Sequence, residues 1–155
     1  MDHRWKPNVT VATVVERTNQ QHEQEYLIVH EVREGKKVYN QPAGHLDEGE
    51  SLADAAIRET REETGWDVTL THIVGIYRFI GANGITYMRH VFAATPVEYN
   101  PDQALDDGII EAVWMTYEQI LNNTNATRSD MVKSALNDFR KGKAYPLSLL
   151  NEPEA

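Results

Sequence analysis

Three glutamates lie close together in a stretch of the chain that has the composition of a helix. Glu59, Glu62 and Glu63 are three and four positions apart, and residues with that spacing share one face of an α-helix. Carboxylates crowded on one face repel one another, and a cation among them lowers the cost of ionising them all. An oxygen-only cluster suits Mg²⁺ or Mn²⁺, which take their remaining ligands from water and from phosphate oxygens.

The flanking residues help to separate a metal site from an ordinary acidic helix face. A glutamate-rich helix face is most often simply hydrated, and the helix alone favours that interpretation. Arg58 lies one turn before Glu62, where its guanidinium can orient that carboxylate. Gly44 and Gly49 bracket a turn whose backbone can supply a carbonyl ligand, and Glu50 stands where the helix begins. This loop favours the metal site.

The stretch from Gly44 to Trp66 resembles the Nudix box. That pattern is glycine, five residues, glutamate, seven residues, Arg-Glu, a bulky aliphatic residue, any residue, Glu-Glu, any residue, glycine and an aliphatic residue. All the fixed positions match, and they are Gly44, Glu50, Arg58, Glu59, Glu62, Glu63 and Gly65. Seven such matches arise by chance about once in 10⁸ start positions. Thr60 and Trp66 depart from the pattern at two packing positions.

The resemblance implies a fold, a cofactor and a set of site residues. The fold is a Nudix α/β/α sandwich with a mixed sheet, in which the box forms a loop–helix–loop. The cofactor is Mg²⁺, with Mn²⁺ as the alternative. Glu59, Glu62 and Glu63 are implied as metal-binding and catalytic residues, Arg58 joins the catalytic group, and the Gly44 backbone carbonyl is a further metal ligand.

The hypothesis for the chemistry is attack of water on phosphorus, with a carboxylate as general base. Glu59 is one candidate for the base. Many Nudix enzymes add an acid from a later region, which here offers Glu111, also a candidate metal ligand, and the loop Asp106-Asp107-Gly108. For any one of these later acids, surface solvation is the competing interpretation.

Runs rich in β-branched residues alternate with helical segments in an order that fits an α/β (α+β) fold. The expected strands are 9–15, 26–32, 38–40, 68–80, 85–95 and 109–115, and the expected helices are 51–64, 116–121 and 129–141. Gly35-Lys36-Lys37 is expected as a turn, and Gln41-Pro42-Ala43-Gly44 should end the third strand. This order argues against a doubly wound parallel sheet.

Composition narrows the class of protein further. A chain of 155 residues, 41% hydrophobic and 25% charged, suits a single domain over 1–155. The net charge of −9 disfavours binding to a nucleic-acid polymer. Cysteine is absent, which excludes disulfides and a thiol nucleophile. Without an apolar run of membrane length or a signal-type segment, we expect a cytoplasmic protein, monomeric or homodimeric, whose partner is a small nucleotide or pyrophosphate.

Substrate contacts are harder to assign from the sequence. The candidates are strand residues that face a cleft in this interpretation, namely Arg78, Arg89 and Tyr77. Phe79 and Tyr87 could stack on a base, although aromatic residues on strands usually belong to a core. The remaining basic residues near a turn are interpreted as surface charges, and they are Arg33, Lys36 and Lys37. His45 and His90 are interpreted as structural or substrate-orienting.

Three further segments are similar to a bacterial subgroup, the NudJ-type phosphatases. These segments are 40–46, 127–129 and 145–147. This similarity implies removal of terminal phosphate from nucleoside di- and triphosphates and from thiamine-pathway pyrophosphates. The alternatives are a Nudix enzyme for linked diphosphates such as ADP-ribose, NADH or dinucleoside polyphosphates, and a non-catalytic nucleotide-sensing module. A sensing module would fit a degenerate box better than this intact one.

Overall fold

A mixed β-sheet runs through the computed structural model, which describes residues 3–123 and 130–153. Its strands are β1 (Asn8–Thr18), β2 (Gln24–Arg33), β3 (Lys36–Asn40), β4 (Ala43–His45), β5 (Trp66–Ile80), β6 (Thr86–Tyr99) and β7 (Ile109–Thr116). The order is β3-β2-β1-β6-β5, with β4 beside β1 and β7 beside β2. β1 and β6 run parallel, whereas the other pairs are antiparallel.

The sheet opens into two halves. β1 and β2 pair at one end, where Glu16 lies opposite Tyr26 and Thr18 opposite Gln24. Farther along, β1 pairs with β4, whereas β2 pairs with β7 and β3. The chain between β3 and β4, at Gln41-Pro42, therefore crosses from one half of the sheet to the other.

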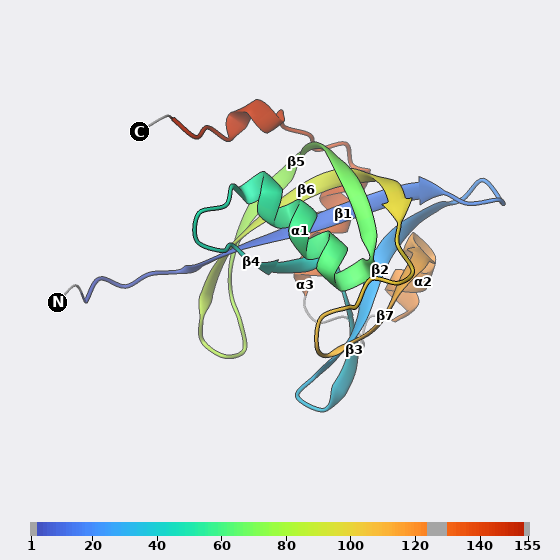
Figure 1. The fold of residues 1–155 in the computed structure, drawn as a ribbon, viewed down its shortest axis with the longest axis horizontal. Helices are drawn as coiled ribbons and strands as arrows, with labels where there is room; N and C mark the ends of the chain where they lie inside the picture. The colour runs from blue at the N-terminus through green and yellow to red at the C-terminus, as the bar shows by residue number, and fades with distance from the viewer. Residues whose placement is uncertain (1–2, 124–129, 154–155) are drawn as a thin grey trace.

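Helices cover both faces of the sheet, as Figure 1 shows with α1 in front and α3 behind. The helices are α1 (Leu52–Thr64), α2 (Tyr117–Asn122) and α3 (Asp130–Arg140), followed by a short 3₁₀ helix, η2 (Leu147–Leu149). Ala55 and Ala56 of α1 share one buried cluster with Phe92, while Ala135 and Leu136 of α3 belong to a second cluster. The expected α/β/α layering is confirmed.

Both ends of α1 are set by local sequence. The Ser51 hydroxyl accepts a hydrogen bond from the Asp54 N–H at 3.0 Å, which satisfies one of the unpaired donors of the first turn. Gly65 adopts φ 78°, and its N–H donates to the Arg61 carbonyl at 2.8 Å. These two caps set where the helix begins and ends.

Several boundaries differ from the sequence-based predictions. Gln41-Pro42 interrupts the strand as expected, but Ala43–His45 resumes as β4 against β1. The turn before β3 is Glu34-Gly35, both with positive φ, so Lys36 and Lys37 belong to the strand. β6 continues past Thr95 to Tyr99, because a register shift accommodates Pro96 opposite Val68.

The segment 127–129, which carries part of the similarity to the NudJ-type phosphatases, lies outside the described residues. Within residues 3–123 and 130–153, no helix is both long and apolar enough to cross a membrane.

Thr60, which replaces an aliphatic residue of the Nudix box, is buried in this fold with a polar partner. Its hydroxyl lies 2.9 Å from that of Thr13 on β1 and donates to the Ala56 carbonyl at 2.8 Å. The Thr13 hydroxyl is therefore the donor to Thr60. A hydroxyl pair ties α1 to β1 where the box normally places a hydrocarbon.

This pair predicts an ordered set of stabilities. Thr60→Val should cost about 1–2 kcal/mol of unfolding free energy, because it leaves the buried Thr13 donor unpaired. Thr13→Val should cost less unfolding free energy, since the Thr60 hydroxyl keeps its hydrogen bond to the Ala56 carbonyl. The double variant should be about as stable as wild type. Urea unfolding measures all three. A double variant as unstable as the sum of the singles would contradict this account.

Candidate active site

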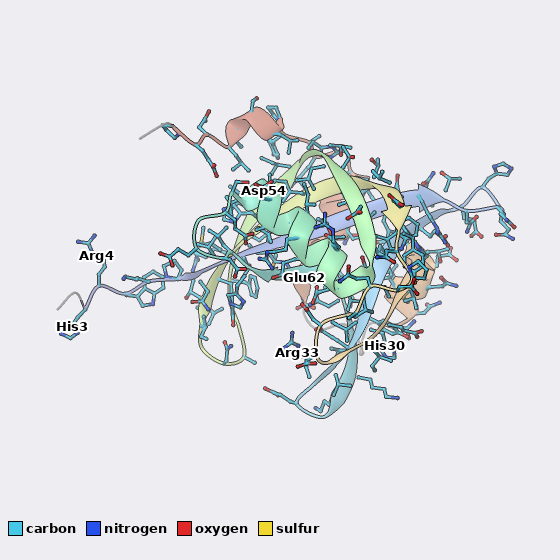
Figure 2. The ribbon with its side chains drawn as sticks, in the orientation of Figure 1. His3, Arg4, His30, Arg33, Asp54 and Glu62 are labelled. Atoms are coloured by element: carbon cyan, nitrogen blue, oxygen red, sulfur yellow. The ribbon has the colours of Figure 1, made fainter. Side chains whose placement is uncertain are left out.

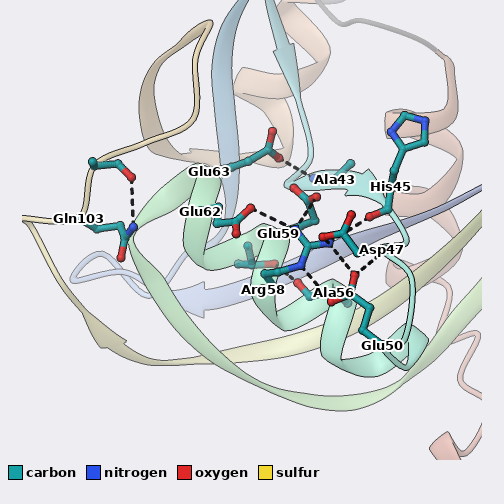
Figure 3. Close-up of polar contacts among 12 residues, drawn as sticks. Ala43, His45, Asp47, Glu50, Ala56, Arg58, Glu59, Glu62, Glu63 and Gln103 are labelled. Carbon is teal, nitrogen blue, oxygen red and sulfur yellow. Dashed lines mark hydrogen bonds and ion pairs between the residues drawn. The ribbon is translucent and has the colours of Figure 1, made fainter.

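Arg58 occupies the centre of the polar residues on α1 (Figure 3). Its Nε and Nη2 donate to the two oxygens of Glu50, at 3.0 and 2.6 Å. Its Nη1 donates to Glu59 at 2.9 Å and to Glu62 at 3.1 Å, and Nη2 also reaches the His45 carbonyl at 3.1 Å. One guanidinium therefore holds both the loop before the helix and two carboxylates of the helix.

Three carboxylates gather beyond Arg58. Glu59, Glu62 and Asp106 each offer an oxygen within 4.8 Å of the others. Asp106 belongs to the loop between β6 and β7, and its N–H donates to the Glu62 carbonyl at 3.0 Å, which fixes this loop on the end of α1. We name Glu59, Glu62 and Asp106 the acidic group. An oxygen-only set of this size fits a hard divalent cation such as Mg²⁺.

β4 supports the acidic group through its backbone. A Cβ placed on Gly44 would overlap the carboxylate of Glu59, so the lack of a side chain at this position leaves room for that carboxylate against β4. The neighbouring Ala43 N–H donates to Glu63 Oε1 at 2.7 Å. Glu59 and Glu63 are therefore both positioned against the backbone of the short strand that sequence patterns did not predict.

The electrostatics of the site disfavour ionisation in the absence of a cation. Burial raises the pKa of Glu63 to about 8, and the nearby charges of Glu59 and Glu31 act in the same direction. Burial also raises the pKa of Glu59 and that of Asp106, with added repulsion from Glu62 in both cases. The hydrogen bond from Arg58 instead lowers the pKa of Glu50. A bound cation would offset the repulsion among these carboxylates and so lower the cost of ionising them.

Three other residues predicted for the site make contacts with residues outside the acidic group. Glu111 of β7 lies 3.8 Å from His30 Nδ1, and its side chain is 58% exposed. Arg78 is exposed on β5, whereas Arg89 is buried on β6 and donates to Gln41 at 2.9 Å. The Tyr77 hydroxyl donates to Asp138 at 2.7 Å. The acidic group thus takes its later acid from Asp106.

The aromatic and histidine candidates make contacts within the protein. Phe79 and Tyr87 stack with ring centroids 5.2 Å apart, and the His45 ring lies 6.3 Å from Tyr87. His90 Nδ1 lies 3.1 Å from the Thr10 carbonyl, consistent with a structural role. Tyr77 lines a cavity of about 350 Å³ beside the C-terminal segment, which is formed by residues other than the acidic group.

The chain matches known proteins over most of its length. The model of the NUDIX domain matches residues 6–135. Phosphatase NudJ of Escherichia coli K12 is 35% identical over 148 residues, which cover 96% of this chain and 93% of that protein. The chain belongs to the Nudix hydrolase family. The alignment with a phosphatase of this family supports a hydrolase that acts on phosphoanhydride bonds.

Solved structures support the same assignment for the fold. A NUDIX hydrolase from Nitrosomonas europaea superposes with a TM-score of 0.90 at 40% identity, covering 96% of this chain and 98% of that one. The NUDIX domain of Shewanella oneidensis NrtR, solved with ADP ribose, gives a TM-score of 0.73 at 16% identity and covers 89% of each chain. At that identity the likeness is one of fold alone.

Some polar residues near the Nudix helix were not identified from the sequence. Glu31 on β2 is 1% exposed, and Asn40 and Gln41 are each 3% exposed. A glutamate on the same strand face as a buried apolar residue, as Glu31 is with Val29, signals a buried charge, but it does not reveal the partner. The partner of Asn40 and Gln41 is Arg89, which lies 49 positions after the first and 48 after the second.

The raised pKa of Glu63 predicts how stability depends on pH in the metal-free protein. A folded-state pKa of about 8, above the usual 4.5, gives stability that is full below about pH 4.5 and is lost as the pH rises to about 8. Glu63→Gln keeps an oxygen that accepts the hydrogen bond from the Ala43 N–H. Because glutamine does not ionise, the variant should not lose this stability at high pH. In EDTA, the variant should therefore melt several degrees above wild type at pH 9. Parallel decline of both proteins from pH 6 to pH 9 would contradict the assignment.

Proposed function

We propose that this Nudix hydrolase is a Mg²⁺-dependent phosphatase that removes terminal phosphate from nucleoside di- and triphosphates and from thiamine-type pyrophosphates. The acidic group carries the proposal, because Glu59, Glu62 and Asp106 offer three oxygens within 4.8 Å beside a single guanidinium. The substrate class draws support from the 35% identity to Phosphatase NudJ, a protein matched over 93% of its length.

Each residue of the acidic group and its surroundings has a distinct role in this proposal. Glu59 and Glu62 would hold Mg²⁺ together with Asp106, while Glu63 and the Gly44 backbone support them from β4. When bound, the cation would neutralise phosphate charge and lower the pKa of the attacking water. Arg58 keeps Glu59 and Glu62 oriented through its Nη1 hydrogen bonds. Glu59 or Asp106 would accept the proton of that water.

Amide substitutions test this division. Glu59→Gln and Glu62→Gln should each lower kcat/KM for a nucleoside triphosphate by about 100-fold or more, because each removes a charged oxygen from the acidic group. Orthophosphate release at fixed Mg²⁺ is the measurement. Asp54→Asn is the matched control, since it makes the same change on the exposed first turn of α1, far from Glu62 (Figure 2). Near-normal turnover in both glutamine variants would refute the metal site.

Asp106 and Glu111 are separated by a second pair of variants. Asp106→Asn should lower turnover strongly, whereas Glu111→Gln should change it little, because Asp106 lies in the acidic group and Glu111 lies beside His30. The same assay ranks them. The reverse ranking would assign the later acid to Glu111.

The products discriminate among substrate classes. The proposed phosphatase releases orthophosphate one unit at a time from a triphosphate. Pyrophosphate as the product would overturn the phosphatase assignment within the family, and cleavage of ADP-ribose, NADH or a dinucleoside polyphosphate alone would favour the enzyme for linked diphosphates. Binding of a nucleotide without Mg²⁺-dependent turnover would indicate a sensing module.

A further inference from the structure

The crossing between the two halves of the sheet is held by one buried side chain. Arg89 of β6 is 7% exposed, and its Nη2 donates to Gln41 Oε1 at 2.9 Å and to Asn40 Oδ1 at 3.5 Å. These two amides stand at the end of β3 and at the first residue of the crossing. A planar guanidinium offers several donors in a fixed geometry, so it can hold both amides at once.

The polar contacts continue across the second half of the sheet. Asn40 Nδ2 donates to Glu31 Oε1 at 3.4 Å, and Arg33 Nε lies 3.4 Å from the same oxygen. Glu31 is 1% exposed, and it is linked to Arg89 through Asn40, which hydrogen-bonds to both residues. Hydrogen bonds among these buried polar groups favour a single arrangement of the segments they join, although Gln41 Nε2 itself has no hydrogen-bond partner among the described residues.

The crossing leads directly into the acidic group. Two residues after Gln41, the Ala43 N–H donates to Glu63 at 2.7 Å, and Gly44 packs against the carboxylate of Glu59. On the backbone, the Thr13 N–H donates to the Pro42 carbonyl at 3.0 Å. A displacement of the crossing by a fraction of an ångström would therefore move the surface on which Glu59 and Glu63 rest.

We propose that Arg89, acting through Gln41 and Asn40, is a positioning residue for the metal site. It fixes the β3–β4 crossing and, through Ala43 and Gly44, the placement of Glu63 and Glu59. The inference rests on the proposed function, because it assigns a role toward the same cation. Arg89 is 7% exposed and hydrogen-bonds to protein side chains, so the proposed role acts through those side chains and is an alternative to the predicted substrate contact.

Binding of Mn²⁺ alone tests this role without reference to turnover. Arg89→Met and Gln41→Met each remove the Arg89–Gln41 bond while keeping an unbranched side chain. Each should weaken Mn²⁺ binding about 10-fold or more in calorimetry, as loss of a supporting shell typically does. The double variant should bind Mn²⁺ no more weakly than Arg89→Met alone, because the bond that Gln41→Met breaks is already lost in Arg89→Met. Arg89→Lys, which retains a donor and the charge, should recover part of the affinity.

Tyr117→Phe is the matched control for lost hydrogen bonding. It removes a 2.6 Å bond from the Tyr117 hydroxyl to Asn137, between α2 and α3 and away from the metal site. This variant should keep wild-type Mn²⁺ affinity even if it lowers the melting temperature. Raising the Mn²⁺ concentration should also restore part of kcat in Gln41→Met, but a merely structural defect would not respond.

The outcomes separate this inference from the proposed function. If wild type binds Mn²⁺ and Arg89→Met and Gln41→Met bind it within about twofold of wild type, the positioning role is wrong and the metal site stands. If wild type binds no Mn²⁺, the proposed function fails, and this inference fails with it. Should Arg89→Met not be recovered folded, Gln41→Met decides between the same results.

Discussion

Repulsion among three carboxylates, two on α1 and one on the β6–β7 loop, is the constraint on which the site depends. Glu59, Glu62 and Asp106 lie within 4.8 Å of one another, and burial raises the pKa of Glu59 and of Asp106. Arg58 offsets part of that repulsion and also ties the helix to Glu50. A protein that keeps such a group sacrifices stability for a site, which is a common compromise at functional positions.

The scaffold explains how the group is held despite its repulsion. Gly65 ends α1, and the Asp106 N–H donates to the Glu62 carbonyl. This backbone hydrogen bond holds the β6–β7 loop so that the Asp106 carboxylate joins the acidic group. On the other side, Gly44 lets β4 approach Glu59 closely. The opening of the sheet between β1 and β2 makes room for that strand. The same crossing of the chain therefore places β4 both in the opening of the sheet and beside the acidic group.

The sequence predicted the parts of this arrangement that depend on local spacing. The limits of α1, its caps and the shared face of its glutamates follow from a 3.6-residue period and from Ser51 and Gly65. β4 was missed because three residues beside a proline carry no strand pattern, and their pairing with β1 is a tertiary effect. Likewise, Arg89 has no local signal that separates a cleft residue from a buried one. Its partners lie in a distant segment of the sequence. The periodicity of residue types along a chain does not reveal contacts between distant segments.

The central claim is that the acidic group exists to bind a divalent cation. Crystals grown with Mn²⁺ and a non-hydrolysable diphosphate, measured for anomalous scattering of the metal, test this claim most directly. The account predicts an anomalous peak within coordination distance, roughly 2.0–2.5 Å, of carboxylate oxygens of Glu59 and Glu62. The claim would be contradicted by a map in which the diphosphate is bound, Arg58 still hydrogen-bonds to Glu59 and Glu62, and no anomalous peak lies beside these two carboxylates.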